Sequence, residues 1–173
     1  TMIIINLGCG NKPIAGKRAI NHDRTKHAPW VDVAHNLNSY PWPWHTNSAD
    51  EIIATDVLEH LDSFIGFFDE CWRILKPGGV ITVQVPRYDS VNVAIDPTHK
   101  RGYHPESFDY LDPATSWGTK YGMYFYTSTA ANPTATAPLT AHNSLALTAG
   151  AGTADHPVPH THSPPPTAST PPK

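Results

Sequence analysis

The sequence has little of several features that mark common classes of protein. Among its 173 residues are only two cysteines, Cys9 and Cys71, and their spacing fits neither a disulfide framework nor a metal-ligand pair. The longest apolar runs are a few residues, far too short for a membrane-spanning helix. Lys and Arg total 12 against 15 Asp and Glu, so the basic excess typical of nucleic-acid-binding surfaces is absent. These features predict a cytoplasmic protein with no membrane or nucleic-acid partner.

Composition changes sharply near residue 127. Most residues between 127 and 173 are Pro, Thr, Ala or Ser, and large apolar side chains are few. Such a segment buries too little apolar surface to offset the entropy lost on ordering. We therefore predict a folded domain at 1–126 and a disordered tail at 127–173.

Short apolar stretches recur through the first half of the chain. They predict five strands, over residues 3–7, 18–23, 31–34, 51–55 and 80–85. Between the last two, apolar residues at three- and four-residue spacing predict a helix over 64–75, capped by Asp62 or Ser63 and followed by a turn at Gly78-Gly79. A strand–helix–strand unit joins parallel neighbours. The predicted fold is therefore a Rossmann-like, mainly parallel α/β sheet with flanking helices.

The first predicted strand runs directly into Gly8-Cys9-Gly10. Glycines let the backbone approach another group closely, and nucleotides bind at the carboxyl ends of strands in open parallel sheets. The alternative is a tight turn without a ligand, because a short Gly-x-Gly is weak by itself. The loop also lacks the third glycine of the dinucleotide fingerprint, which disfavours a nucleotide-dependent oxidoreductase.

Asp23 ends the second predicted strand. A carboxylate at this place can accept hydrogen bonds from both ribose hydroxyls of an adenosine. The alternative is an Asp that only caps the following turn. Together with the glycine loop, the ribose role is favoured.

Three stretches in this order, the glycine loop, Ser48–Leu61 and Arg73–Gly79, resemble the class I S-adenosylmethionine-dependent methyltransferases of the small-molecule type, often grouped as type 11. The resemblance covers residues 3–86. It implies methyl transfer from S-adenosylmethionine to a small-molecule acceptor. The cofactor-binding residues that it implies are Gly8, Cys9, Gly10, Asp23, Asn36, Leu37, Asp56 and Val57.

Two local departures from the wider family bear on this resemblance. Asn36 stands where the family commonly has Asp, but an amide oxygen can still accept from the adenine amino group. Thr55–Leu58 replaces the Pro-Pro-aromatic turn of enzymes that methylate amino groups of nucleic-acid bases, so that activity is not predicted.

The resemblance places the turn after the fourth strand beside the reacting methyl group. His60 is the candidate catalytic base, because its unperturbed pKa lies near neutrality; the alternative is a histidine bonded only to local backbone. The candidate acceptor-binding residues are Glu59, His99, Tyr103 and His104. The loop that holds the last three can equally be structural. No metal is predicted, because no ligand spacing signals one and alignment alone can promote methyl transfer.

The C-terminal part departs from the family, whose sheet ends in an antiparallel hairpin. Tyr121–Tyr126 is similar to the start of a sixth strand, but the Pro-rich composition that follows predicts that the hairpin is lacking. Either a native disordered linker or a lost reading frame near residue 127 explains this, and the second is favoured because the change falls inside an expected strand.

A missing hairpin has two consequences. The fifth strand would keep an open edge, which predicts self-association through it. The second consequence, which the uncertain catalytic base also favours, is an alternative function as a non-catalytic cofactor-binding or interaction protein derived from a methyltransferase.

Overall fold

The computed structural model describes residues 2–16, 18–112, 115–121, 139–140 and 144–150. In chain order the elements are β1 (Ile4–Leu7), β2 (Ala19–Asp23), β3 (Val33–Ala34), β4 (Ala49–Thr55), the 3-10 helix η1 (Leu58–His60), α1 (Phe64–Ile74), β5 (Leu75–Pro86), α2 (Val91–Ile95), the 3-10 helix η2 (Pro105–Leu111), α3 (Ser116–Tyr121), β6 (Leu139–Thr140) and β7 (Ser144–Gly150).

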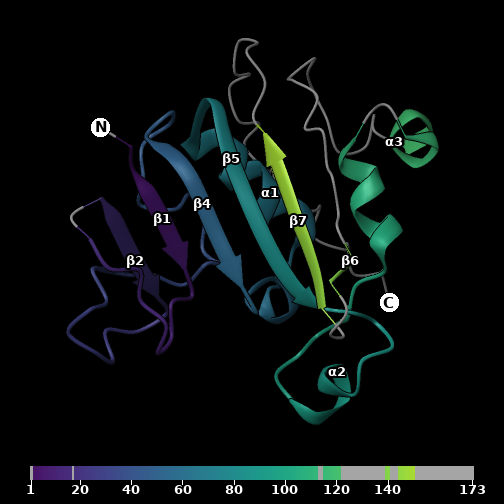
Figure 1. Ribbon diagram of the computed structural model, residues 1–173, viewed down its shortest axis with the longest axis horizontal. Coiled ribbons are helices and arrows are strands. Elements are labelled where there is room, and N and C mark those ends of the chain that lie inside the picture. The colour runs from purple at the N-terminus through teal and green to yellow at the C-terminus, as the bar shows by residue number, and fades with distance from the viewer. Residues whose placement is uncertain (1, 17, 113–114, 122–138, 141–143, 151–173) are drawn as a thin grey trace, which may run out of the picture.

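The strands form one sheet in the order β3-β2-β1-β4-β5-β7-β6 (Figure 1). β1 pairs in parallel with β2 on one side and with β4 on the other, and β5 continues the parallel pairing beside β4. The strand order therefore reverses between β1 and β4, and the carboxyl ends of these strands share one edge of the sheet. Ligands of open α/β sheets bind at such a reversal. The predicted Rossmann-like, mainly parallel sheet is confirmed.

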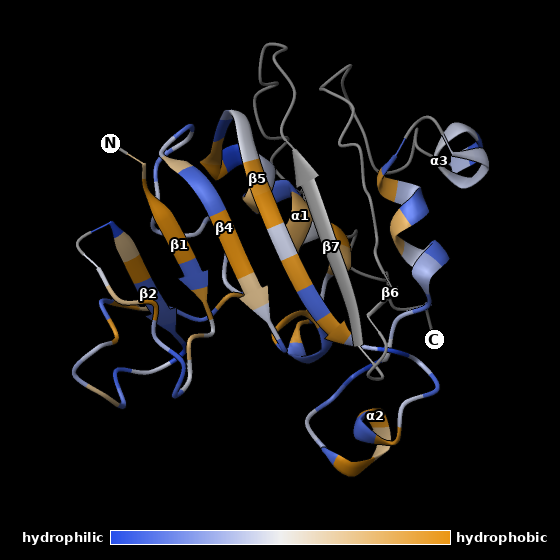
Figure 2. Ribbon diagram, viewed as in Figure 1, coloured by the Kyte–Doolittle hydropathy of each residue, from blue (hydrophilic) through white to orange (hydrophobic). Residues whose placement is uncertain are grey.

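One face of the sheet carries most of the core. Alternate residues of a strand face the same side, and the fully buried residues of the three central strands include Ile5, Leu7, Ile52, Ala54, Ile81, Val83 and Val85. The same strands show long hydrophobic stretches in Figure 2. α1 packs behind β5 in Figure 1 and buries Phe67 and Phe68 among other residues. The Ser63 hydroxyl caps it by accepting from the Gly66 N–H at 2.9 Å, as predicted.

β5 begins earlier than predicted. Its ladder with β4 pairs Ala49 with Leu75 and then Glu51 with Val80, so the residues between Leu75 and Val80 bulge out of register. Gly78 supports the bulge with a φ of 80°. The turn predicted at Gly78-Gly79 is therefore a bulge inside a long strand.

The prediction that the antiparallel hairpin is lacking is wrong. β7 pairs antiparallel with β5, with Val80 opposite Gly150 at one end of the ladder and Pro86 opposite Ser144 at the other. β6 pairs antiparallel with β7. The long outer edge of β5 offers a row of backbone hydrogen bonds, which orders a strand of small residues that lacks strong apolar alternation. That edge is thus covered, and the predicted self-association through it loses its basis.

The predicted boundary at residue 126 also needs revision, because the sheet continues into β6 and β7. Tyr121 ends α3 and does not begin a strand, while 122–126 lie outside the described residues. The remainder of the predicted tail, 127–138, 141–143 and 151–173, lies outside them too. Among the described residues, no helix is long and apolar enough to cross a membrane.

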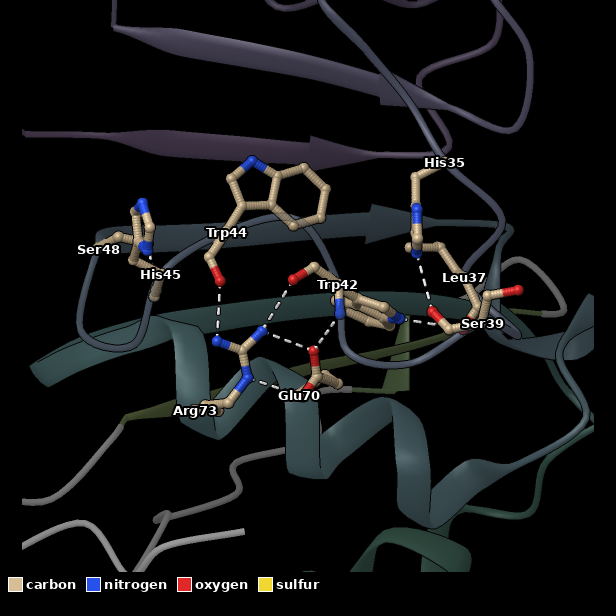
Figure 3. Close-up of polar contacts among 9 residues, drawn as sticks. All are labelled: His35, Leu37, Ser39, Trp42, Trp44, His45, Ser48, Glu70 and Arg73. Carbon is tan, nitrogen blue, oxygen red and sulfur yellow. Dashed lines mark hydrogen bonds and ion pairs between the residues drawn. The ribbon is translucent and has the colours of Figure 1, made fainter. Parts of the chain in front are cut away.

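A buried ion pair fastens the loop after β3 to α1 (Figure 3). Arg73 donates to both carboxylate oxygens of Glu70 at 2.7 Å, and the Glu70 carboxylate also accepts from the Trp42 backbone N–H at 2.6 Å. Arg73 further donates to the carbonyl oxygens of Trp42 and Trp44, at 3.2 and 2.8 Å. Trp42 is 2% exposed and packs edge-on against Phe67. The loop is therefore part of the core.

We expect Arg73→Ala to lower the free energy of unfolding by about 2–4 kcal/mol, because it leaves the Glu70 carboxylate buried without its counter-charge. The matched control is Lys76→Ala, which removes the partly exposed pair of Lys76 with Asp50 and should cost under about 1 kcal/mol. Urea denaturation of both variants measures the difference. Equal losses would contradict the structural role of the Glu70 pair.

Candidate functional site

A cavity of about 720 Å³ opens at the carboxyl ends of the parallel strands. It is lined by Gly8, His22, Asp23, Arg24, His35, Asn36, Leu37, Asn38, Asp56, Val57, His60, Leu61, Pro97, Thr98, His99 and Lys100. The segments after β1, β2, β3 and β4 meet there with one loop from beyond β5. Eight of the thirteen residues predicted from the sequence line the same cavity, namely Gly8, Asp23, Asn36, Leu37, Asp56, Val57, His60 and His99.

Gly8 is required where β1 ends. Its φ is 59°, and a Cβ there would lie 2.5 Å from Cγ2 of Val57 in the turn after β4. The Gly8 N–H donates to Nδ1 of His22 at 3.3 Å, and the opposite ring nitrogen, Nε2, donates to the His35 carbonyl at 3.0 Å. These partners make His22 neutral, and burial lowers its pKa in the same direction. A buried histidine thus fixes the glycine turn.

The Asp23 carboxylate joins the glycine turn to the cavity. One oxygen accepts from the Gly10 N–H at 2.8 Å and the other from the Arg24 N–H at 2.6 Å. An ionised carboxylate has about four acceptor positions, so about two stay available. A Cβ at Gly10 would meet nothing within 4 Å, so the space beside this backbone is open.

Asn36 and Leu37 form another part of the cavity wall. The Asn36 side-chain oxygen accepts from the Asn38 N–H at 3.1 Å, which holds the side chain in a local turn. Leu37 is 5% exposed, and its carbonyl accepts from the Trp42 indole N–H at 3.0 Å. The buried Trp42 therefore sets the position of this wall.

The turn after β4 places Asp56 and Val57 beside Gly8 in the wall of the cavity. Asp56 has a φ of 55°, which non-glycine residues rarely adopt, and its N–H donates to the Gln84 carbonyl at 2.9 Å. η1 follows directly and carries Glu59 and His60.

The segment 88–102 folds over this turn as a compact loop. Its base is closed by two backbone hydrogen bonds, from Tyr88 N–H to the Tyr103 carbonyl at 2.9 Å and from Tyr103 N–H to the Pro86 carbonyl at 3.2 Å. Near its C-terminal end the loop is bound to η1 and the residues after it, because the Lys100 N–H donates to the Glu59 carbonyl at 2.8 Å and the Lys100 ammonium pairs with Asp62. His99 is thereby brought beside η1.

Glu59, His60 and His99 form a cluster at this end of the cavity. The rings of the two histidines have centroids 4.7 Å apart, and Nε2 of His99 lies 3.9 Å from Oε1 of Glu59. Thr98 donates its single hydroxyl hydrogen to Asp96 at 2.6 Å, so Nδ1 of His60 must donate in its own 3.0 Å bond to the Thr98 oxygen. A neutral His60 therefore has its free lone pair on Nε2.

Glu59 is the most unusual member of the cluster. Its side chain is fully buried, and no described group donates a hydrogen bond to either oxygen. Burial raises the pKa of Glu59 to about 7, and the nearby carboxylates of Asp56 and Asp96 add to the rise. Near neutral pH this carboxyl can therefore hold or release a proton.

Five predicted site residues do not line the cavity: Cys9, Gly10, Glu59, Tyr103 and His104. Cys9 is buried, and burial raises the pKa of its thiol. The Tyr103 hydroxyl donates to the Leu58 carbonyl at 3.2 Å, and burial raises its pKa to about 12. His104 caps η2. Tyr103 and His104 therefore have structural contacts, which was the alternative for their loop.

The cavity also contains residues that the sequence did not single out. His22 and Thr98 are two of these, and each acts through a hydrogen bond that only the fold creates. A signal for His22 was its place one residue before Asp23, at the carboxyl end of a strand. For Thr98 no local signal existed.

The fold is a Rossmann-like α/β domain with a cavity at its strand reversal, which is where open parallel sheets bind their ligands. Residues 6–83 match the family described as "Methyltransferase domain". A curated relative from Mycolicibacterium smegmatis, named a probable S-adenosylmethionine-dependent methyltransferase, is 40% identical over 68 residues. That match covers 39% of this chain and 25% of the relative, so the chain spans about a quarter of that protein's length.

Solved structures share the fold across most of the chain. A methyltransferase from Archaeoglobus fulgidus superposes with a TM-score of 0.59 at 16% identity, covering 86% of each chain. One from Mesorhizobium loti gives 0.55 at 12% identity, covering 86% of this chain and 90% of the other. Over residues 6–83 the chain is thus similar in sequence to S-adenosylmethionine-dependent methyltransferases, and it shares the fold of the solved ones.

We expect Gly8→Ala to lower the free energy of unfolding by about 3 kcal/mol, because it adds both a left-handed penalty and a clash with Val57. Gly10→Ala is the matched control. Its φ is 49° but its Cβ would meet open space, so only the backbone penalty of about 1–2 kcal/mol applies. Thermal and urea unfolding measure both. If Gly8→Ala were no less stable than Gly10→Ala, the close approach of Gly8 to the Val57 side chain would be contradicted.

The pKa of Glu59 predicts a pH dependence of stability. Because the folded-state value of about 7 lies above the ordinary 4.5, the folded protein holds this proton more tightly. The protonated Glu59 carboxyl contributes roughly 2–3 kcal/mol to the free energy of unfolding below pH 4.5, and this contribution is lost as the pH rises through about 7. Glu59→Gln cannot ionise and should lose that slope. Urea denaturation from pH 4.5 to 8 with a chelator present measures the difference between the two proteins, and parallel curves would contradict the raised pKa.

Proposed function

We propose that the protein binds S-adenosylmethionine in this cavity and transfers its methyl group to a small-molecule acceptor. The observation that carries the proposal is the meeting of the Gly8 loop, Asp23 and the Asp56–Val57 turn around one cavity at the strand reversal. The family match over residues 6–83 supports the same conclusion.

The residues present fit the cofactor. A volume of about 720 Å³ lies within the range of cofactor and ligand pockets. The available acceptor positions of Asp23 suit the two ribose hydroxyls, and the space that a Cβ at Gly10 would occupy is open. When bound, S-adenosylmethionine supplies a methyl group activated by a positively charged sulfur.

We assign the cofactor contacts by region of the cavity. Gly8 and Gly10 adjoin the methionine portion, and Asp23 binds the ribose. Asn36 and Leu37 adjoin the adenine, with the second lone pair of the Asn36 oxygen available to its amino group. Asp56 and Val57 lie between the two ends, beside the glycine loop.

The acceptor end is the part of the cavity formed by η1 and the loop 88–102. His60 lines it and, when neutral, has a free lone pair on Nε2, which suits proton removal from an acceptor or direct binding of one. Thr98 and Lys100 line the same end, so a polar acceptor is favoured.

The alternative function, a non-catalytic protein derived from a methyltransferase, was motivated by a missing hairpin and an uncertain catalytic base. Because β7 covers β5, the first of these motives falls away, and His60 is the candidate that answers the second. Methyl transfer is therefore the function that the cavity supports best.

Calorimetry with S-adenosylmethionine and S-adenosylhomocysteine tests the cofactor assignment. We expect micromolar binding, about −8 kcal/mol, and at least tenfold weaker binding by Asp23→Ala, because charge-assisted hydrogen bonds to the ribose are lost. Glu51→Ala is the matched control, since it removes a carboxylate from β4 that does not line the cavity, and it should bind like the wild type.

Circular dichroism of each variant separates loss of binding from loss of folding. Binding by Asp23→Ala as tight as that of the control would overturn the ribose assignment. A folded wild-type protein that binds neither ligand would overturn the proposed function.

A further inference from the structure

We propose that Glu59, His60 and His99 bind a divalent transition-metal ion of the Zn²⁺ type at the acceptor end of the cavity. The ligand atoms of these three residues all lie within 4.8 Å of one another. Spacing along the sequence gave no sign of such a site, because η1 supplies two of the residues and the loop 88–102 supplies the third. The fold brings them together because the N–H of Lys100, next to His99, donates to the Glu59 carbonyl in η1.

The burial of Glu59 is the independent observation that points to an ion. Its side chain is fully buried beside the two histidines, and neither carboxylate oxygen has a hydrogen-bond partner among the described residues. Nδ1 of His99 is also buried without a partner. Buried polar groups are nearly always hydrogen-bonded or bound to a metal. A cation between Glu59 and His99 would satisfy the carboxylate that the fold otherwise leaves alone.

His60 is oriented as a metal ligand by groups behind it. Asp96 accepts from the Thr98 hydroxyl, and the Thr98 oxygen accepts from Nδ1 of His60, which leaves Nε2 as the atom with a lone pair. A hydrogen bond of this kind from the far ring nitrogen fixes the tautomer and the ring plane of metal-binding histidines. Asp96 and Thr98 are thus positioning residues for the proposed site.

The donor set suits a transition metal better than Mg²⁺ or Ca²⁺, which prefer oxygen ligands. Two histidines and one carboxylate are the protein ligands of several catalytic zinc sites, where a fourth position stays open. His60 and His99 both line the cavity, so an open position would face the acceptor.

The ligand atoms of the three residues need to move only slightly closer together to bind one ion. Two ligands of one Zn²⁺ ion, each about 2.0–2.1 Å from it, lie at most about 4.2 Å apart. His99 Nε2 and Glu59 Oε1 meet this limit at 3.9 Å. No pair in the cluster exceeds 4.8 Å, so small side-chain rotations complete the site.

A bound ion would make the acceptor end prefer acceptors that can coordinate it. This part of the inference depends on the proposed function. An acceptor with a hydroxyl or thiol group would coordinate the ion through oxygen or sulfur. Coordination lowers the pKa of that group, so its O–H or S–H bond breaks, the proton passes to water and the bonding electron pair stays on the donor atom. Metal binding itself does not depend on the proposed function.

Calorimetric titration of the full chain with Zn²⁺, after removal of metals by a chelator, tests the site. We expect one tight site in the wild type and at least 100-fold weaker binding in Glu59→Gln and in His99→Ala. His45→Ala is the matched control, because it removes a histidine exposed in the loop before β4, and it should keep the tight site. Histidines elsewhere in the chain contribute the same weak background to every variant.

Two further measurements make the outcomes decisive. Co²⁺ bound by the wild type should show the visible absorption of low-symmetry coordination, and Glu59→Gln should not. Metal-free unfolding curves establish that each variant folds. Zn²⁺ binding by Glu59→Gln as tight as wild type, or no tight site in the folded wild type, would overturn the proposal. Binding of S-adenosylmethionine in those same samples would show that only the metal site has failed and not the proposed function.

Discussion

The approach of Gly8 to Val57 is the contact on which the rest of the site depends. It joins the turn after β1 to the turn after β4 so closely that no Cβ fits between them. Because these strands are neighbours at the reversal of the sheet, their turns form the two sides of one cavity. His22 holds the first turn from behind, and the positive φ of Asp56 shapes the second.

The site has two ends with different physical character. At the glycine end, backbone groups and the Asp23 carboxylate satisfy one another and still leave acceptor positions for a ligand. At the η1 end, Glu59 is buried beside His99 with no hydrogen-bond partner for its carboxylate among the described residues. Burial of that kind opposes folding unless a proton or a cation compensates for it. The proposed metal ion would supply that compensation.

The parts of the fold that could be predicted from the sequence are those with strong local patterns. The first strand and its glycines, the helix capped by Ser63 and the apolar strands beside it all carry their own signals. β7 carries only a weak signal of its own, and its antiparallel pairing with β5 is what identifies it as a strand. The Pro-rich surroundings therefore concealed a strand whose partner lies far back in the chain.

The sequence by itself determined the glycine turn, the Asp after the second strand and the positions of the first five strands along the chain, since each depends on residues close together in the chain. Only the tertiary structure decided which loop residues face the cavity. His99 meets Glu59 and His60 because a backbone hydrogen bond fixes the adjacent Lys100 to η1, while Tyr103 turns its hydroxyl into the core. Such contacts depend on the free energy of packing distant segments together, which no local pattern of residues records.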